Sequence, residues 1–263
     1  MDDMTQTERR LYLIKALQMN DRRFEDDTPQ NMTSAEQKRL LRAMMNVWMP
    51  VPIDEEYKKI EGEYLRQDIA ERGITRLTDL SPIQGDLYLW QGDITTLECD
   101  AIVNAANSQM LGCFVPLHNC IDNCIHSAAG LSLRYRCYEI MLEQGHEEPT
   151  GQAKITPGYN LPSKFVLHTV GPIVSGRLND RHCELLKSCY LSCLKLAEEN
   201  GCKSIAFCCI STGVFGFPQH KAAQIAVNTV KEYKESTGSD IKVIFNVFRD
   251  DDLMIYRDLL DRC

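Results

Sequence analysis

The sequence predicts a three-layer α/β/α domain with a mixed, largely parallel sheet, preceded by an N-terminal helical extension. Three observations support this fold class. From about residue 86 onward, strand-like and helix-like segments alternate along the chain. Several of the strand-like segments are apolar throughout, as strands covered on both faces require. Residues 5 to about 72 show only helical patterns. We therefore divide the chain into an extension, residues 1–80, packed on a main domain, residues 81–263.

Three helices are expected in the extension. Glu8–Met19 places its apolar side chains near one face of a helix. Thr33 and Glu36 match a capping box that opens a second helix, and Asp54 can cap a third helix that ends at Gly73. The same pattern fits helices that cover a site, bind a partner or cap the sheet, and we favour packing onto the main domain.

The main domain is expected to alternate six strands with four helices. The strands are predicted at Leu87–Gly92, Ala101–Asn104, Ala153–Pro157, Phe165–Val170, Ser204–Cys209 and Lys242–Val247. The helices are predicted at Asp122–Gln144, Arg181–Asn200, Pro218–Ser236 and Asp250–Leu260. Ligands of such folds bind outside the carboxyl ends of the strands, so the loops that follow the strands are the place to look for chemistry.

Composition excludes several classes of protein. The 263 residues carry a net charge of −8, which argues against a general nucleic-acid or anionic-membrane surface. No apolar run approaches the roughly 20 residues that a membrane helix needs. The charged N-terminus does not match a secretory signal. The twelve cysteines are therefore expected to be mostly buried, reduced thiols, which points to a cytoplasmic protein.

Two loops carry polar side chains directly after predicted strands. In Gln91–Thr95, Asp93 can accept hydrogen bonds from an exocyclic amine or a ribose hydroxyl, or it can simply cap a turn. In Val103–Asn107, Asn104 and Asn107 flank two alanines. The small residues permit close approach of a ligand and the amides can orient hydroxyls, although asparagines in turns are also common.

A third loop, Gly112–Asp122, contains Cys113, His118 and Cys120 within eight residues. Two thiolates and an imidazole suit Zn²⁺, and three protein ligands with one open position are typical of a catalytic zinc site. The alternative is a loop with two core thiols and an unrelated histidine. Cys124 is a competing ligand that we expect in the core.

The fourth loop, Ser211–Pro218, follows an apolar strand and opens a helix. Its glycines let backbone N–H groups turn toward an anion, and a helix N-terminus favours phosphate. The hydroxyls of Ser211 and Thr212 add donors, and Phe215 or Phe217 can cover a sugar or base. The alternative is a tight strand-to-helix connection. Neither a Walker loop nor a dinucleotide-binding G-x-G-x-x-G is present.

Together these loops resemble the macrodomain family, whose members bind ADP-ribose. The matching segments are Gly92–Thr95, Asp100–Asn107, Gly158–Pro162, His168–Pro172 and Ser211–Pro218. The resemblance covers residues 86 to 260. It is closest to a subgroup, the zinc-containing microbial macrodomains that act as protein-ADP-ribose hydrolases. The loop with Cys113, His118 and Cys120 stands where other hydrolytic macrodomains carry a glycine-rich stretch.

The resemblance assigns a role to each candidate residue. It makes Asp93 the acceptor of the adenine amine, with Ile94 beside it, and Asn107 a catalytic residue at the distal ribose. Ile121 and the catalytic Asp122 approach the diphosphate and distal ribose. The remaining ADP-ribose contacts are Cys120, Ser211, Thr212, Gly213, Val214 and Phe215. The zinc ligands are Cys113, His118 and Cys120.

The resemblance implies a zinc-dependent hydrolase that removes mono-ADP-ribose from Asp or Glu side chains and reverses a sirtuin-type modification. A sirtuin-type transferase and a lipoylated carrier resembling the glycine-cleavage H protein are the implied partners. The metal either binds the distal-ribose hydroxyls or activates water. His126 and His168 are rival bases that we expect to be packing histidines.

Two other functions fit the same resemblance. The main alternative is a reader module that binds ADP-ribose without cleaving it, since fold alone does not decide function. Another is a phosphatase or deacetylase acting on free ADP-ribose derivatives. The loop Gly112–Asp122, called the metal loop below, favours the hydrolase, because a reader does not need three metal ligands beside the distal ribose.

Overall fold

The computed structural model describes residues 4–261, and its main sheet has six strands in the order β2-β8-β7-β4-β6-β5. All neighbouring strands are parallel except the edge strand β5, which pairs antiparallel with β6. The strands are β2 (Leu87–Gln91), β4 (Ala101–Ala106), β5 (Ala153–Pro157), β6 (Phe165–Val170), β7 (Ser204–Phe207) and β8 (Lys242–Val247). The mixed, largely parallel sheet predicted from the sequence is confirmed.

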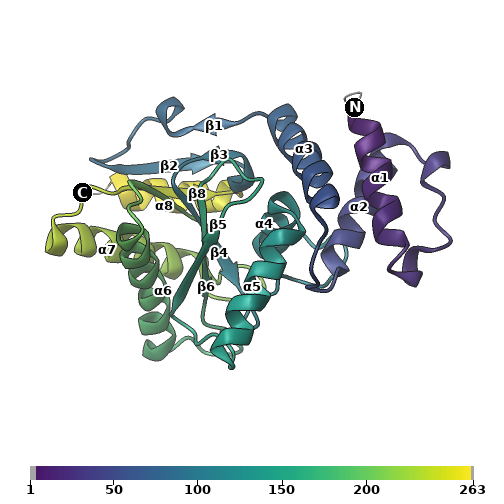
Figure 1. Ribbon diagram of the computed structural model, residues 1–263. Coiled ribbons are helices and arrows are strands. Elements are labelled where there is room, and N and C mark those ends of the chain that lie inside the picture. Colours follow the sequence, from purple (N-terminus) through teal and green to yellow (C-terminus); the bar gives the residue numbers. More distant parts are fainter. Residues whose placement is uncertain (1–3, 262–263) are drawn as a thin grey trace.

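Helices cover both faces of this sheet (Figure 1). The helices of the main domain are α4 (Ile121–Ala129), α5 (Leu131–Gln144), α6 (Asp180–Glu199), α7 (Gln219–Thr237) and α8 (Asp250–Asp261). Helices α6 and α7 pack against each other, α7 against α8, and α4 and α5 against strands β4 and β5. The apolar runs of β4, β6, β7 and β8 are buried between these layers, so the sheet forms the centre of the core.

The N-terminal segment folds into three helices beside α4 (Figure 1): α1 (Gln6–Gln18), α2 (Ser34–Val47) and α3 (Glu55–Arg72). They start where capping chemistry places them, since Thr33 and Glu36 form a capping box and Asp54 caps α3. The three helices surround an apolar cluster of their own, which Leu131 of α5 completes. They also contact the main domain directly, through α2 and α3 against α4.

The structure corrects the predicted helix Asp122–Gln144, which is two helices. The chain breaks at Gly130, whose φ of +94° lies in the region that favours glycine. A Cβ at Gly130 would stand 2.6 Å from Oε2 of Glu61, a residue of α3. The predicted strand Ser204–Cys209 ends earlier, at Phe207. Two short strands, β1 (Thr75–Arg76) and β3 (Leu97–Glu98), have no counterpart in the sequence prediction.

Cysteine usage agrees with the prediction of reduced thiols. All eleven cysteines among residues 4–261 are free, and six of them are buried. In the same residues, no helix has both the length and the apolar character needed to cross a membrane.

Candidate functional site

The four loops singled out in the sequence lie at one edge of the sheet. They follow β2, β4 and β7, and these strands run parallel within the same sheet, so their carboxyl ends meet. Helix α4 starts at this edge, directly after the cysteine-containing loop, residues 107–120, and packs against strand β4. The parallel topology thus collects the loops predicted to carry chemistry.

Cys113, His118 and Cys120 form a compact cluster. Their ligand atoms all lie within 4.8 Å of one another, and Cys113 Sγ is 3.5 Å from His118 Nδ1. All three side chains are half-buried, and Cys120 occupies the N-cap position of α4. Burial raises the pKa of the Cys120 thiol above its usual range, and a cation bound beside it would favour the thiolate. Two sulfurs and one imidazole nitrogen at this spacing fit Zn²⁺.

Asp122 lies two residues after this cluster, buried in the first turn of α4. The Nδ2 of Asn104 donates a hydrogen bond of 2.7 Å to its Oδ1. Burial raises the pKa of Asp122 to about 6, while the Asn104 hydrogen bond and the charge of Arg134 act in the opposite direction. A carboxyl group with this pKa is ionised at neutral pH and can still accept a proton, which suits general-base or charge-stabilising chemistry.

His126 and His168 lie behind Asp122, in the interior. The Nε2 of His126 is 3.5 Å from Asp122 Oδ1, one helical turn away. His168 accepts from Asn104 Nδ2 at 3.1 Å and donates from Nε2 to Thr156 Oγ1 at 3.0 Å. Burial lowers the pKa of both histidines, that of His168 to about 3, so both are neutral. The expectation that they pack the interior agrees with this arrangement.

These two histidines and Cys137 form a second group whose ligand atoms lie within 4.8 Å of one another. All three are buried, and burial raises the pKa of the Cys137 thiol. We therefore interpret this group as part of the packed interior beneath Asp122.

Asn107 shapes a turn. Its Oδ1 accepts from the backbone N–H groups of Gln109 and Met110, and its Nδ2 donates to the carbonyl of Gly112 at 3.0 Å. This is the turn-forming role that was the alternative in the sequence. Asn104, which was not assigned a site role, is instead the asparagine that touches Asp122. The pattern of two asparagines could have suggested it, but the sequence does not show which one faces α4.

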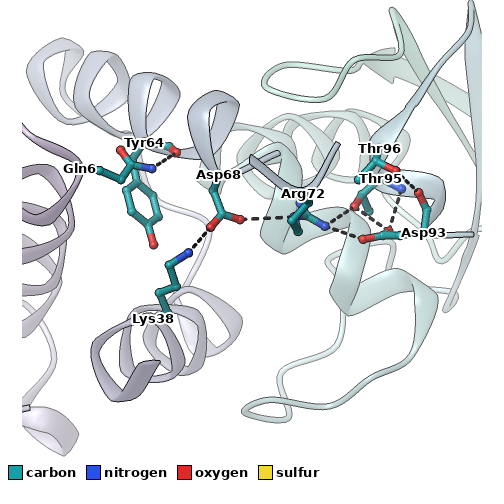
Figure 2. A network of polar contacts seen from close by, with 8 residues as sticks. All are labelled: Gln6, Lys38, Tyr64, Asp68, Arg72, Asp93, Thr95 and Thr96. Atoms are coloured by element: carbon teal, nitrogen blue, oxygen red, sulfur yellow. Dashed lines mark hydrogen bonds and ion pairs between the residues drawn. The ribbon is translucent and has the colours of Figure 1, made fainter. Parts of the chain in front are cut away.

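Asp93 combines two roles that the sequence left open. Its Oδ1 caps a short 3-10 turn, Ile94–Thr96, by accepting from the backbone N–H and the hydroxyl of Thr95. Its Oδ2 accepts from Arg72 in the last turn of α3, as Figure 2 shows. The Asp93 side chain remains 40% exposed, so one carboxylate oxygen stays within reach of a ligand. Ile94 is buried beneath it.

A chain of ion pairs continues from Asp93 into the N-terminal helices (Figure 2). Arg72 also pairs with Asp68 at 3.4 Å, and Asp68 pairs with Lys38 of α2 at 2.8 Å. A pocket of about 290 Å³ lies along this chain. It is lined by Lys38, Leu41, Arg42, Met45, Tyr64, Leu65, Asp68, Ile69, Arg72, Asp93, Thr95, Cys124, Ser127 and Ala128. Cys124, expected in the core, is half-buried and lines this pocket.

Two backbone hydrogen bonds fix the shape of the loop Ser211–Phe217. Val174 donates to the Phe215 carbonyl at 2.8 Å, and Phe217 donates to the Ser211 carbonyl at 3.0 Å. Gly213 and Val214 face solvent, and Thr212 and Phe215 are half-buried. Phe217 is buried in the core, which leaves Phe215 as the aromatic side chain that can cover a ligand. Helix α7 starts two residues later, so its N-terminus adjoins the loop.

Phe248 belongs to the same edge and was missed in the sequence. It follows β8, next to β2 in the sheet, and its carbonyl accepts from Gln91 Nε2 at 3.2 Å. Its side chain is 77% exposed. An aromatic residue directly after an apolar strand, at the carboxyl end where ligands of such folds bind, is the signal that could have identified it.

Comparisons with known proteins match this architecture. The family described as the Macro domain matches residues 103–226. A protein named protein-ADP-ribose hydrolase from Treponema medium is 56% identical over 262 residues, which cover 98% of this chain and all of that protein. This chain belongs to the macrodomain family. A protein-ADP-ribose hydrolase from Staphylococcus aureus (strain MRSA252) is 51% identical, with 85% of this macrodomain protein and 84% of the relative covered.

Solved macrodomain structures share the fold. The Trypanosoma brucei macrodomain in complex with ADP-ribose has a TM-score of 0.64 at 30% identity and covers 84% of this chain and 94% of its own. The Oceanobacillus iheyensis macrodomain with ADP has a TM-score of 0.62 at 38% identity and covers 69% of this chain and 94% of its own. The predicted macrodomain fold is thereby confirmed.

Proposed function

We propose that this macrodomain protein is a zinc-dependent protein-ADP-ribose hydrolase that removes mono-ADP-ribose from Asp or Glu side chains. The observation that carries the proposal is the cluster of Cys113, His118 and Cys120 next to the buried carboxyl group of Asp122. A module that only binds ADP-ribose needs a site for the base and a loop for the phosphates. It does not need three metal ligands beside the distal ribose. Two relatives with the name protein-ADP-ribose hydrolase, at 56% and 51% identity, support the same activity.

The nucleotide part of the ligand extends along the edge of the sheet. The free lone pair of Asp93 Oδ2 accepts from the adenine amine beside Ile94, and the exposed ring of Phe248 offers a face for the base. The backbone N–H groups of Ser211–Phe215 and the N-terminus of α7 receive the diphosphate. Binding at these remote points fixes the position of the distal ribose and so contributes to orientation at the bond that breaks.

The distal ribose then faces the loop and helix α4. Cys120, Ile121 and Asp122 border it from the start of α4. Asn107 reaches it with the second hydrogen of Nδ2, since an amide nitrogen carries two and Gly112 takes one. This placement brings the anomeric carbon close to the Asp122 carboxyl group.

The bond that breaks joins C1″ of the distal ribose to an oxygen of the modified carboxylate. Its cleavage develops positive charge on the ribose, as in glycoside hydrolysis. Above its pKa of about 6, Asp122 carries a negative charge that stabilises this cation or accepts a proton from the attacking water. Asn104 fixes one carboxylate oxygen, Oδ1, which leaves Oδ2 to act in the reaction. Zn²⁺ held by Cys113, His118 and Cys120 would supply a Lewis acid for ribose hydroxyls or water.

The biological setting of the proposal comes from the resemblance of the metal loop. On that basis we propose that the protein opposes a sirtuin-type transferase, and its reduced thiols support a cytoplasmic location. A lipoylated carrier that resembles the glycine-cleavage H protein is the proposed modified partner.

The test compares linkages with wild type and Asp122→Asn. Purified proteins carrying mono-ADP-ribose on Asp/Glu or on Arg are incubated with each enzyme, and released ADP-ribose is quantified. We expect release only from the carboxylate linkage, reduced by about 10²–10⁴-fold in Asp122→Asn. Calorimetric binding of ADP-ribose controls for an intact pocket. Tight binding without release from any linkage would instead identify a reader module.

A further inference from the structure

Helix α2, from the N-terminal segment, contacts the backbone of the metal loop. The Nη2 of Arg42 donates to the carbonyl of His118 at 2.9 Å and to Oδ1 of Asn119 at 3.2 Å. These residues are 76 and 77 positions apart in the sequence. The first of these bonds fixes the peptide group of a residue whose side chain belongs to the cluster of Cys113, His118 and Cys120.

Asn46, one turn further along α2, binds the backbone of Leu117, the residue before His118. Its side chain is almost fully buried, at 1% exposure, and its Oδ1 accepts from the backbone N–H of Leu117 at 2.9 Å. Leu117 has a φ of +58°, a left-handed conformation that is strained for a non-glycine residue. Asn46 therefore stabilises a strained backbone next to His118. Its Nδ2 donates in the other direction, to Ser127 Oγ of α4 at 2.9 Å.

A third contact joins the C-terminal end of α2, through Arg134, to Phe114 in the loop. The buried guanidinium of Arg134, in α5, donates to the carbonyls of Met45 and Trp48 at 2.9 and 2.5 Å. The same group lies 4.6 Å from the ring centroid of Phe114, the residue after Cys113. Helix α2 thus contacts the loop directly at residues 117–119 and through Arg134 at Phe114, and this loop has neither helix nor strand of its own between residues 107 and 120.

We propose that Arg42 and Asn46 are positioning residues that set the geometry of the metal centre, so that helix α2 is an integral part of it. This inference rests on the proposed function, because it assigns the residues that make the metal loop a site. A ligand set must be held to within about 0.5 Å by its supporting residues. Partners behind the ligands typically account for 10–100-fold in metal affinity.

Metal binding and the docking of α2 are thermodynamically linked in this proposal. If α2 stabilises the metal-binding form of the loop, bound metal must stabilise the docking of α2 by the same free energy. Zinc should therefore slow amide hydrogen exchange in α2, although α2 supplies none of the three residues of the cluster.

The experiment measures Zn²⁺ affinity by competition with a chromogenic chelator for wild type, Arg42→Ala and Asn46→Ala. We expect 10–100-fold weaker zinc binding in both variants. Two matched controls test the location of the effect. Ser127→Ala removes the other hydrogen-bond partner of Asn46, and Lys38→Ala removes an ion pair of the same helix with Asp68. Both controls should bind zinc within about threefold of wild type, since neither contacts the loop backbone.

Thermal unfolding without zinc separates lost positioning from lost folding. Asn46→Ala and Ser127→Ala remove the same hydrogen bond between α2 and α4, so the loss of that bond should affect the Tm of both variants. Weaker zinc binding in Asn46→Ala alone then reports the lost contact with the loop. Hydrogen exchange of α2 with and without zinc gives a second readout, with Cys120→Ser as the control that removes a cluster residue. Equal zinc affinity in wild type, Arg42→Ala and Asn46→Ala overturns the inference alone. Absence of zinc binding by the wild type overturns it together with the zinc dependence of the proposed function. Zinc affinity that depends on α2, without ADP-ribose release, supports the inference and refutes the hydrolase.

Discussion

Gly171 lies where a single added methyl group should disturb the phosphate loop. It follows β6, and a Cβ built on it would be 2.1 Å from Oγ of Ser211 and 2.9 Å from Cγ2 of Ile210. Ser211 is 6% exposed and has a φ of +66°, so its backbone is strained and its side chain is enclosed. We therefore predict that Gly171→Ala displaces Ser211 and with it the first turn of the loop.

The size of the effect follows from the packing. Overpacking a close-packed interior costs about 1–3 kcal/mol, and each kcal/mol lowers the Tm of a chain of this length by about 2–4 °C. Hydrogen bonds to a charged phosphate contribute about 1.5–3 kcal/mol each. Loss of one such bond from the displaced loop would weaken ADP-ribose binding by about 10–100-fold.

Calorimetry with ADP-ribose and thermal unfolding measure both effects. Gly176→Ala is the control, because no atom in the described part of the chain lies within 4 Å of a Cβ built there. The double variant Gly171→Ala/Ser211→Ala should recover part of the stability, since the shortest contact is to the Ser211 hydroxyl oxygen. Wild-type affinity and Tm in Gly171→Ala would refute this interpretation of the loop.

Three further predictions concern other parts of the molecule. Burial raises the pKa of Glu61 to about 8, so the folded state retains a proton that the unfolded state releases, and stability falls as pH rises from about 4.5 to 8. Urea unfolding of wild type and Glu61→Gln across this range isolates the Glu61 contribution, which should be a decrease of at most about 5 kcal/mol that only the wild type shows; the same pH dependence in both proteins would exclude Glu61 as a cause. Phe248→Ala should weaken ADP-ribose binding by about 1–3 kcal/mol in calorimetry, with the Tm unchanged because the ring is exposed; equal affinity would remove Phe248 from the base site. Cys120→Ala should lose ADP-ribose release and zinc binding but retain its fold by circular dichroism, and release at the wild-type rate would show that zinc is not catalytic.

The sequence predicts the sheet well because its strands are defined locally. Strands β5, β6 and β8 begin and end at the predicted residues, where apolar or β-branched runs meet turn residues. The break between α4 and α5 is not local. Residues 122–144 have continuous helical character, and the close approach of Glu61 from α3 accounts for the need for glycine at position 130.

The candidate site likewise combines features that are local in the sequence with contacts that depend on packing. The sequence identifies Cys113, His118 and Cys120 as a group because eight residues of one loop contain them, and the structure places their ligand atoms together. The partner of Asp122 could not be chosen between Asn104 and Asn107, because the choice depends on how α4 packs on β4.

Partners supplied by the N-terminal helices were also out of reach of the sequence. Arg72 lies 21 positions from Asp93 in the sequence, and Asn46 lies 71 positions from Leu117. In the sequence, an arginine or asparagine of an amphipathic helix cannot be told from the other residues of its solvent-facing polar side. Only the packing of α2 and α3 against α4 directs these side chains to the site.

Metal-dependent release of ADP-ribose can be followed in a single time course. ADP-ribose release from an Asp/Glu mono-ADP-ribosylated protein is followed with zinc-loaded enzyme, with chelator-treated enzyme and after zinc is restored. We predict release that stops on chelation and returns with zinc. Release that continues undiminished after verified removal of the metal, or no release by the zinc-loaded enzyme while ADP-ribose binding is intact, would contradict zinc-dependent hydrolysis by this protein.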